Sequence, residues 1–151
     1  MKYASFLDIS KWNTSNVTDM SYMFNNCENL LILPDISKLD TSKVIDMRFM
    51  FSGFKSLSIL PNISKWNISK VCYMNNMFYN CNSLTFLPNI SKWNLENLEN
   101  IQTDNIFLNC YSLIYYPSNF HRKFRKDQEN NEIYDIYCLN ALYKEITKNN
   151  K

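Results

Sequence analysis

Apolar residues return along this chain with a fixed period. The segment Ile9-Ser10-Lys11-Trp12 recurs as Ile36-Ser37-Lys38-Leu39, Ile63-Ser64-Lys65-Trp66 and Ile90-Ser91-Lys92-Trp93, each starting 27 residues after the last. A period of this length is typical of repeat proteins, in which each repeat is one coil stacked on its neighbour. The pattern therefore predicts about four coils of 27 residues that share one continuous core.

Two different spacings of apolar residues follow one another within each repeat. The first is the i, i+3, i+4, i+7 spacing of one helical face, shown by Met20, Met23, Phe24 and Cys27. It predicts one or two turns of helix at about 19–25. After Cys27 the apolar residues come at every third position, and here we expect a short strand near 30–33 and an extended corner through 36–44.

The position after the expected helical turn carries residues that enter the left-handed backbone region at low cost. It is occupied by Asn26, Gly53, Asn80 and Asn109. Helices commonly end in that conformation, so the exchange of Asn for Gly indicates where each turn ends. Asp19 and Asp46 stand where an N-cap would serve such a helix.

The cysteines predict packing and not metal binding. Cys27, Cys81 and Cys110 share one repeat position, which Phe54 takes in the second repeat. A position that accepts Cys or Phe is a buried apolar one, because a free thiol behaves as a small hydrophobic group. The odd number of cysteines, five, fits a reducing compartment better than a disulfide framework. Zinc needs ligands clustered at short spacing, which the chain lacks, so we expect no metal site.

The end of the chain departs from the repeat pattern. Ile106-Phe107 matches Met23-Phe24 only after two extra residues. We therefore divide the chain into a repeat domain at 1–117 and a basic linker with a C-terminal capping helix at 118–151. The helix is expected at 132–147, where it would shield the last coil.

The core of the repeat resembles a known family. The segment Val17-Thr18-Asp19-Met20-Ser21-Tyr22-Met23-Phe24-Asn25-Asn26-Cys27 is similar to the N-V-T-x-M-S-x-M-F-x-x-C core of BspA-type leucine-rich repeats. The resemblance covers about residues 3–117. It implies an α/β leucine-rich-repeat solenoid of parallel strands and short helical turns, used for binding and without catalytic residues. Members similar to this chain include surface proteins of bacteria and protists, and intracellular or viral proteins in other lineages.

Composition argues against several other functions. The net charge of +2 is too small to favour nucleic acid, and no apolar run approaches the length of a membrane span. The single His has no recognisable Cys or Ser partner, and one Gly cannot build a phosphate loop, so we expect neither catalysis nor a cofactor. The stretch Met1–Phe6 lacks the apolar run of a signal peptide. We therefore expect an intracellular protein, with the cell surface left open by the resemblance.

One position next to the core residues of the expected strand is apolar in every repeat. It is occupied by Ile32, Ile59, Phe86 and Tyr115. If the strand alternates, these side chains point away from Leu33 and form an exposed apolar column, which is typical of an interaction site. The alternative is that each coil covers them with its own corner segment.

A second column consists of lysines. Its members are Lys11, Lys38, Lys65 and Lys92. Stacked about 5 Å apart, neighbouring lysines would repel by about 1 kcal/mol in water. Three residues before the first two lysines stand Asp8 and Asp35, and the same place before the last two is taken by Asn62 and Asn89. Lys65, Lys70 and Lys92 are therefore the better candidates for an anionic partner, and a solvated face is the alternative.

These patterns lead to a functional hypothesis. We expect a non-catalytic protein–protein interaction module that binds another protein. The alternative is an adhesive or structural cell-surface repeat protein, or a fragment of a longer array. The first coil, with Tyr3, Phe6 and Ile9, would present an unpaired strand edge, which also predicts self-association through the N-terminal coil.

Overall fold

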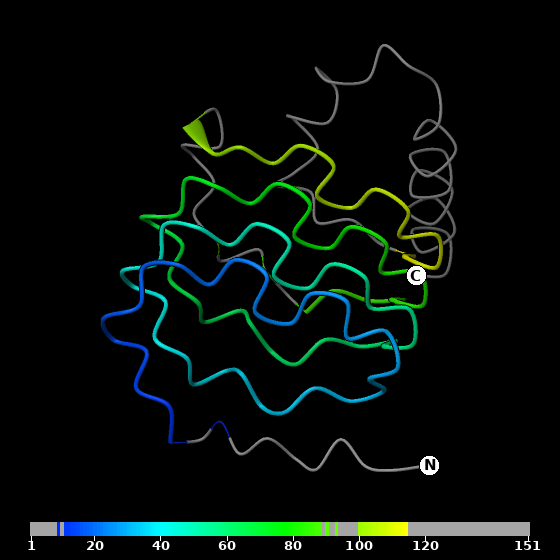
Figure 1. Ribbon diagram of the computed structural model, residues 1–151, viewed down its shortest axis with the longest axis horizontal. Coiled ribbons are helices and arrows are strands. Elements are labelled where there is room, and N and C mark those ends of the chain that lie inside the picture. The colour runs from blue at the N-terminus through cyan, green and yellow to red at the C-terminus, as the bar shows by residue number, and fades with distance from the viewer. Residues whose placement is uncertain (1–8, 10, 89, 91–92, 94–99, 115–151) are drawn as a thin grey trace, which may run out of the picture.

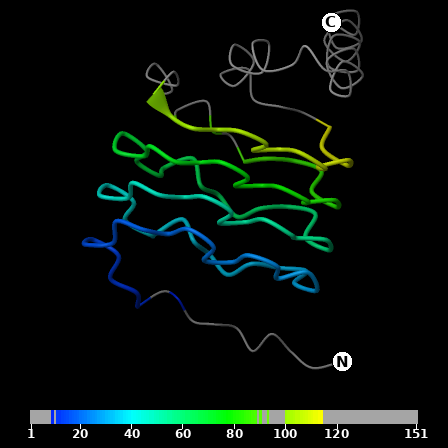
Figure 2. The same cartoon turned by 45° about the horizontal axis from the view of Figure 1, so that its top comes forward.

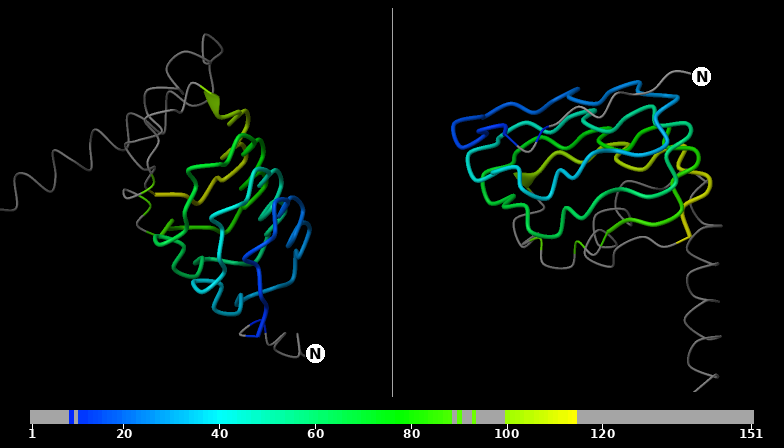
Figure 3. Two further views of the ribbon diagram at one scale, coloured as in Figure 1. Left: turned by 90° about the vertical axis from the view of Figure 1, so that its left-hand side faces the viewer. Right: turned by 90° about the horizontal axis from the view of Figure 1, so that it is seen from below.

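A computed structural model of the chain describes Ile9, residues 11–88, Ile90, Trp93 and residues 100–114. The chain forms coils that stack in sequence order, so that each coil lies beside the next (Figure 1) and the stack grows from the blue coil to the yellow one (Figure 2). Each coil crosses the molecule twice, in two layers (Figure 3). We call the first crossing the turn run (18–26, 45–53, 72–80 and 101–109) and the return the extended run (30–39, 57–66 and the described part of 84–93).

The expected α/β leucine-rich-repeat solenoid of strands and helical turns is wrong. The described residues contain no α-helix and no strand, and Asn100 alone among them has 3-10 conformation. Their only paired β structure consists of isolated parallel bridges, Asp19–Asp46, Asp46–Tyr73, Ile59–Phe86 and Tyr73–Gln102. The linker and capping helix expected at 118–151 lie outside the described residues.

The helical turn expected at 19–25 fails because each turn run holds two left-handed residues and not one. The predicted set is confirmed, with φ of 57° at Asn26, 79° at Gly53, 59° at Asn80 and 64° at Asn109. A second set stands four residues earlier, at Tyr22, Phe49, Asn76 and Asn105. A left-handed residue cannot continue a right-handed helix. Asp19 therefore caps no helix, and its Oδ1 instead accepts the Ser21 N–H at 2.8 Å within a turn.

Hydrogen bonds between coils replace the helix. Alternate N–H groups of the first turn run donate to carbonyls of the second, at 2.7–3.0 Å. The pairs are Met20 to Asp46, Tyr22 to Arg48, Phe24 to Met50, and Asn26 to Ser52. The partners are 26 residues apart here and between the second and third coils, for example Phe51 N–H to Met77. They are 28 apart between the third and fourth, as in Phe78 N–H to Ile106, which confirms the predicted two-residue insertion.

The core lies between the two runs. Its centre is a stack of rings from successive turn runs, Phe24, Phe51, Phe78 and Phe107, whose centroids are 5.3–5.8 Å apart and whose planes differ by 5–10°. The extended runs add Trp66 and Trp93, whose buried Nε1–H groups donate to the carbonyls of Ile36 and Ile63, each at 3.1 Å. Each ring therefore ties its coil to the preceding one.

The shared cysteine position is buried as predicted in the second, third and fourth coils, where Phe54, Cys81 and Cys110 are 1%, 1% and 2% exposed. In the first coil Cys27 is only partly buried. The Cys81 thiol donates to the Phe51 carbonyl at 3.1 Å, and the Cys110 thiol to the Phe78 carbonyl at 2.9 Å. The pKa of Cys81 is raised mainly by a hydrogen bond with Cys110 and, as a second cause, by burial of the thiol. The Cys81 thiol therefore serves packing and stays protonated.

Candidate docking face

The extended run repeats its environment every three residues. In the first coil Leu33, Ile36 and Leu39 are 5%, 0% and 6% exposed, and the second coil buries the equivalent Leu60, Ile63 and Trp66. A strand would bury every second residue, so the alternation on which we based the outer column is wrong. Every third residue of the run instead faces the core, and the run closes in a turn in which the Leu39 N–H donates to the Ile36 carbonyl at 3.2 Å and the Trp66 N–H to the Ile63 carbonyl at 3.1 Å.

The outer side of the extended run therefore carries three columns. Ile32, Asp35 and Lys38 are all exposed in the first coil, and Ile59, Asn62 and Lys65 are exposed in the second. We call this surface the outer face. Between these positions, Leu33 and Ile36 are buried, whereas Pro34 and Ser37 are partly exposed. The apolar column and the lysine column thus lie on the same side of the molecule.

The apolar column is open along its described length. Ile32 is 71% exposed, Ile59 63% and Phe86 52%, so no corner segment covers them. The parallel bridge Ile59–Phe86 and the hydrogen bond from Thr85 N–H to the Ser58 carbonyl, 2.9 Å long, place the second and third members side by side. The fourth member predicted from sequence, Tyr115, lies outside the described residues.

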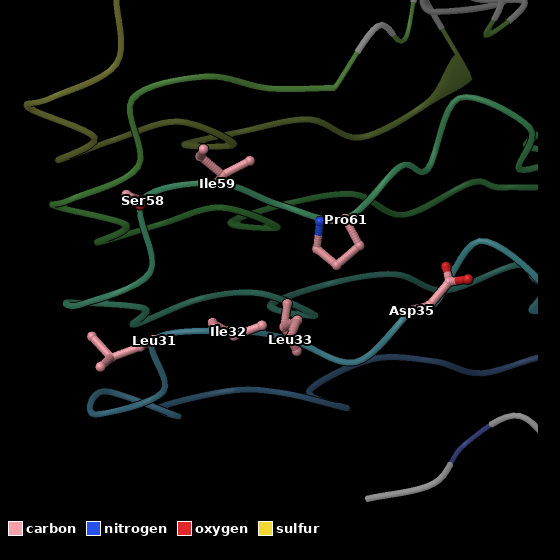
Figure 4. A pocket seen from close by; sticks show the side chains of 7 residues that line it. All are labelled: Leu31, Ile32, Leu33, Asp35, Ser58, Ile59 and Pro61. Atoms are coloured by element: carbon pink, nitrogen blue, oxygen red, sulfur yellow. The ribbon is translucent and has the colours of Figure 1, made fainter. Parts of the chain in front are cut away.

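A shallow depression lies between the first two extended runs. It has a volume of about 490 Å³ and is lined by Leu31, Ile32, Leu33, Asp35, Ser58, Ile59 and Pro61. The lining residues come from two neighbouring runs, and the Pro61 ring lies between these runs (Figure 4). Leu31, which is 69% exposed, was missed by the sequence reasoning. Its repeat position holds Ser58 and Thr85 in the next coils, so no column marks it.

The lysine column is exposed as well. Lys11, Lys38 and Lys65 are all exposed, and so is Lys70 at the corner after the second extended run. Between described residues, ion pairs form only from Arg48 to Asp46 at 2.6 Å and from Lys55 to Glu28 at 2.8 Å. Lys92 lies outside the described residues.

Asp35 and Asn62 form the middle column and make the same turn. The Ser37 N–H donates to Asp35 Oδ1 at 2.9 Å, and the Ser64 N–H donates to Asn62 Oδ1 at 3.0 Å. Hydrogen bonds from the Ser37 side chain and backbone, aided by the charge of Lys38, lower the pKa of the Asp35 carboxyl. The middle column is therefore anionic in the first coil and neutral in the second, which leaves Lys65 without the compensation that Lys38 receives.

The charge of Arg48 on the turn runs is already paired. Arg48 pairs with Asp46 and lies over the Tyr73 ring, 5.2 Å from its centroid. Tyr22 stacks on Phe49 with centroids 4.8 Å apart. Among the described residues no three His, Cys, Asp or Glu side chains gather as a metal site would require. No helix in that part of the chain is long and apolar enough to cross a membrane.

These features define a repeat protein of stacked, hydrogen-bonded coils with an exposed apolar column on one side. Residues 1–120 match the model of the family described as Mycoplasma protein of unknown function, DUF285, and the chain belongs to that family. Comparison with curated proteins and with solved structures finds no match. The family description names no activity, so the resemblance to BspA-type repeats stays an expectation.

Proposed function

We propose that the chain is a non-catalytic module that binds another protein through the apolar column Ile32, Ile59 and Phe86, with Tyr115 as its fourth member by repeat position. One observation carries the proposal: these three described side chains are more than half exposed and follow one another from coil to coil. Their apolar surface contributes nothing to the core, which the residues at every third position already fill. Contiguous exposed apolar surface of this kind marks interaction sites.

The construction of the column suits a rigid binding surface. Its members come from different coils, and the ladder between turn runs fixes the spacing of those coils. Little side-chain or backbone ordering would then be needed on binding, which favours affinity. The apolar lining of the depression also favours packing over chemistry. Its one carboxyl, Asp35, accepts hydrogen bonds that lower its pKa, the opposite of what a general acid requires near neutral pH.

The test is a selection of random linear peptides on the immobilised chain. Peptides that bind the parent protein should lose affinity for Ile59→Ser and Phe86→Ser. They should keep their affinity for Tyr111→Ser, a matched control that is 76% exposed and lies outside the column. Thermal melting should show that all three variants remain folded. Peptides that bind Ile59→Ser and Phe86→Ser as tightly as the parent would refute the proposal, and so would unfolding of both variants.

A further inference from the structure

We infer that the partner is an acidic and apolar protein segment, in which carboxylates stand on the same side as the residues that contact the apolar column. The inference rests on the proposed function and deepens it by naming the chemistry of the partner. It follows from the placement of the lysine column on the outer face. The carboxylates of the partner would contact Lys38 and Lys65, and Lys92 joins them by repeat position.

The extended run sets the order of the two kinds of contact. Lys38 follows Ile32 by six residues, and Lys65 follows Ile59 by six. Both lysines lie in turns at the end of their runs, which are closed by hydrogen bonds from the Leu39 N–H to the Ile36 carbonyl at 3.2 Å and from the Trp66 N–H to the Ile63 carbonyl at 3.1 Å. A partner segment that covers both columns must therefore present its apolar group over the run and its carboxylate over the turn that follows.

The charges on the face specify the sign of the partner. Lys38 and Lys65 occupy equivalent positions in neighbouring coils, and both are exposed. Asp35 offsets the first, whereas the neutral Asn62 leaves the second uncompensated. A carboxylate placed over Lys65 would gain attraction and would also relieve the repulsion between the lysines. The strongest contact is thus expected over the second coil, next to Ile59.

The same face argues against nucleic acid as the partner. Phosphate recognition depends on several basic contacts that track a backbone. The outer face offers a few lysines at one margin, while its centre and opposite margin carry a carboxylate and a row of apolar side chains. An apolar column of this kind matches side chains of a protein, with the charge contacts setting specificity at the rim.

The peptide selection tests this inference through the composition of the peptides it enriches. Peptides that depend on Ile59 should be net acidic relative to the starting library and should contain apolar residues. Affinity for Lys65→Gln should fall about twofold to threefold, and affinity for Lys65→Glu further, because exposed ion pairs contribute modestly. Lys43→Glu is the matched control, an exposed lysine outside the column that donates to Asn16 Oδ1 at 2.7 Å. Added salt should weaken binding to the parent chain more than binding to Lys65→Gln.

The outcomes separate this inference from the proposed function. Neutral or basic peptides that still require Ile59 would overturn the acidic partner and leave the binding module standing. Equal losses of peptide affinity for Lys65→Glu and Lys43→Glu would also overturn the acidic partner and leave the binding module standing. Binding that is indifferent to Ile59 and Phe86 would overturn both. Sedimentation adds a further readout: an oligomer of the parent chain that Lys65→Glu dissociates would show that a second copy occupies the face, which contradicts an acidic partner.

Discussion

The backbone of Asn26 lies directly against Gly53 of the next coil. A Cβ built on Gly53 would be 3.1 Å from the Asn26 Cα and would overlap the Asn26 carboxamide oxygen. Gly53 also has a φ of +79°, in the left-handed region. Two independent requirements, conformation and close approach, therefore select glycine at the one repeat position where the other coils carry Asn.

Gly53→Ala should therefore destabilise the protein by about 1–3 kcal/mol, because it adds a steric overlap to the cost of a left-handed alanine. Chemical denaturation measures the change. Asn76→Ala is the control, because Asn76 has a φ of 58° and its change to Ala measures the cost of a left-handed alanine. Asn80 is unsuitable, since its Oδ1 accepts a hydrogen bond from Asn109 Nδ2 at 2.7 Å. If Gly53→Ala costs no more than Asn76→Ala, the approach of Asn26 is not limiting.

Leu57 is a second position where the stack should be sensitive. Leu57 and its counterpart Leu84 in the next coil are each 1% exposed, which confirms that both lie in the core. Leu57→Ala should cost about 2–5 kcal/mol through lost burial and the cavity left behind. Ile32→Ala, at a side chain that is 71% exposed, should stay within about 0.5 kcal/mol of the parent. A Leu57→Ala melting curve that overlays the parent curve would contradict the core assignment.

The indole hydrogen bond of Trp66 offers a test of the ties between coils. Its Nε1–H donates to the Ile36 carbonyl, and the side chain is 4% exposed. Trp66→Phe should cost about 1–3 kcal/mol, since the ring shrinks and a buried hydrogen bond is lost. The lower part of that range is expected because the Leu39 N–H also donates to the Ile36 carbonyl. Trp12→Phe, at a ring that is 42% exposed, should change the free energy of unfolding much less.

The turn at Asp35 predicts an acid-sensitive contribution to stability. Hydrogen bonds from Ser37 and the charge of Lys38 hold the pKa of this carboxyl below its ordinary value of 3.8. Because the folded-state pKa is the lower one, the contribution is present above the unfolded-state value. It is lost as the pH falls from that value through the folded-state pKa.

Asp35→Asn should leave stability unchanged near neutral pH, because Asn62 makes the same turn in the next coil. The variant should also lose less stability than the parent on acidification, which denaturant titrations at several pH values would reveal. Asp35→Ala removes the acceptor and should be less stable than the parent at neutral pH. Parallel pH profiles for the parent and Asp35→Asn would show that the carboxyl contributes nothing.

Several features of this fold could be read from the sequence because they depend on local chemistry. The 27-residue period predicted the stacked coils, and the exchange of Asn for Gly predicted the left-handed positions at Asn26 and Gly53. The displaced match of Ile106-Phe107 predicted the change of register in the fourth coil. In each case a residue type with a known preference returns at a fixed spacing, and this recurrence distinguishes the preference from chance.

The backbone conformation of the turn runs, in contrast, was decided by tertiary structure. The spacing of Met20, Met23, Phe24 and Cys27 suits a helix, yet Tyr22 and Phe49 adopt positive φ values of 59° and 54°. Aromatic residues have no preference for that region, so nothing at Tyr22 or Phe49 marked the break. The only residues at this repeat position that favour a left-handed conformation are Asn76 and Asn105, in the third and fourth coils. The hydrogen bonds to the next coil and the stacking of Tyr22 on Phe49 offset the cost, and both exist only once coils are stacked.

The candidate site divides in the same way. The sequence by itself determined that Ile32, Ile59 and Phe86 share an apolar position and that Lys38 and Lys65 share a basic one. Only the tertiary structure decided that both columns lie on one face. The reason is physical: stacking buries every third residue of the extended run against the core, so that Ile32 and Lys38, which stand between the buried positions, both face outward. A two-residue period and a three-residue period both expose Ile32, but only the packed coil shows which of them the chain adopts.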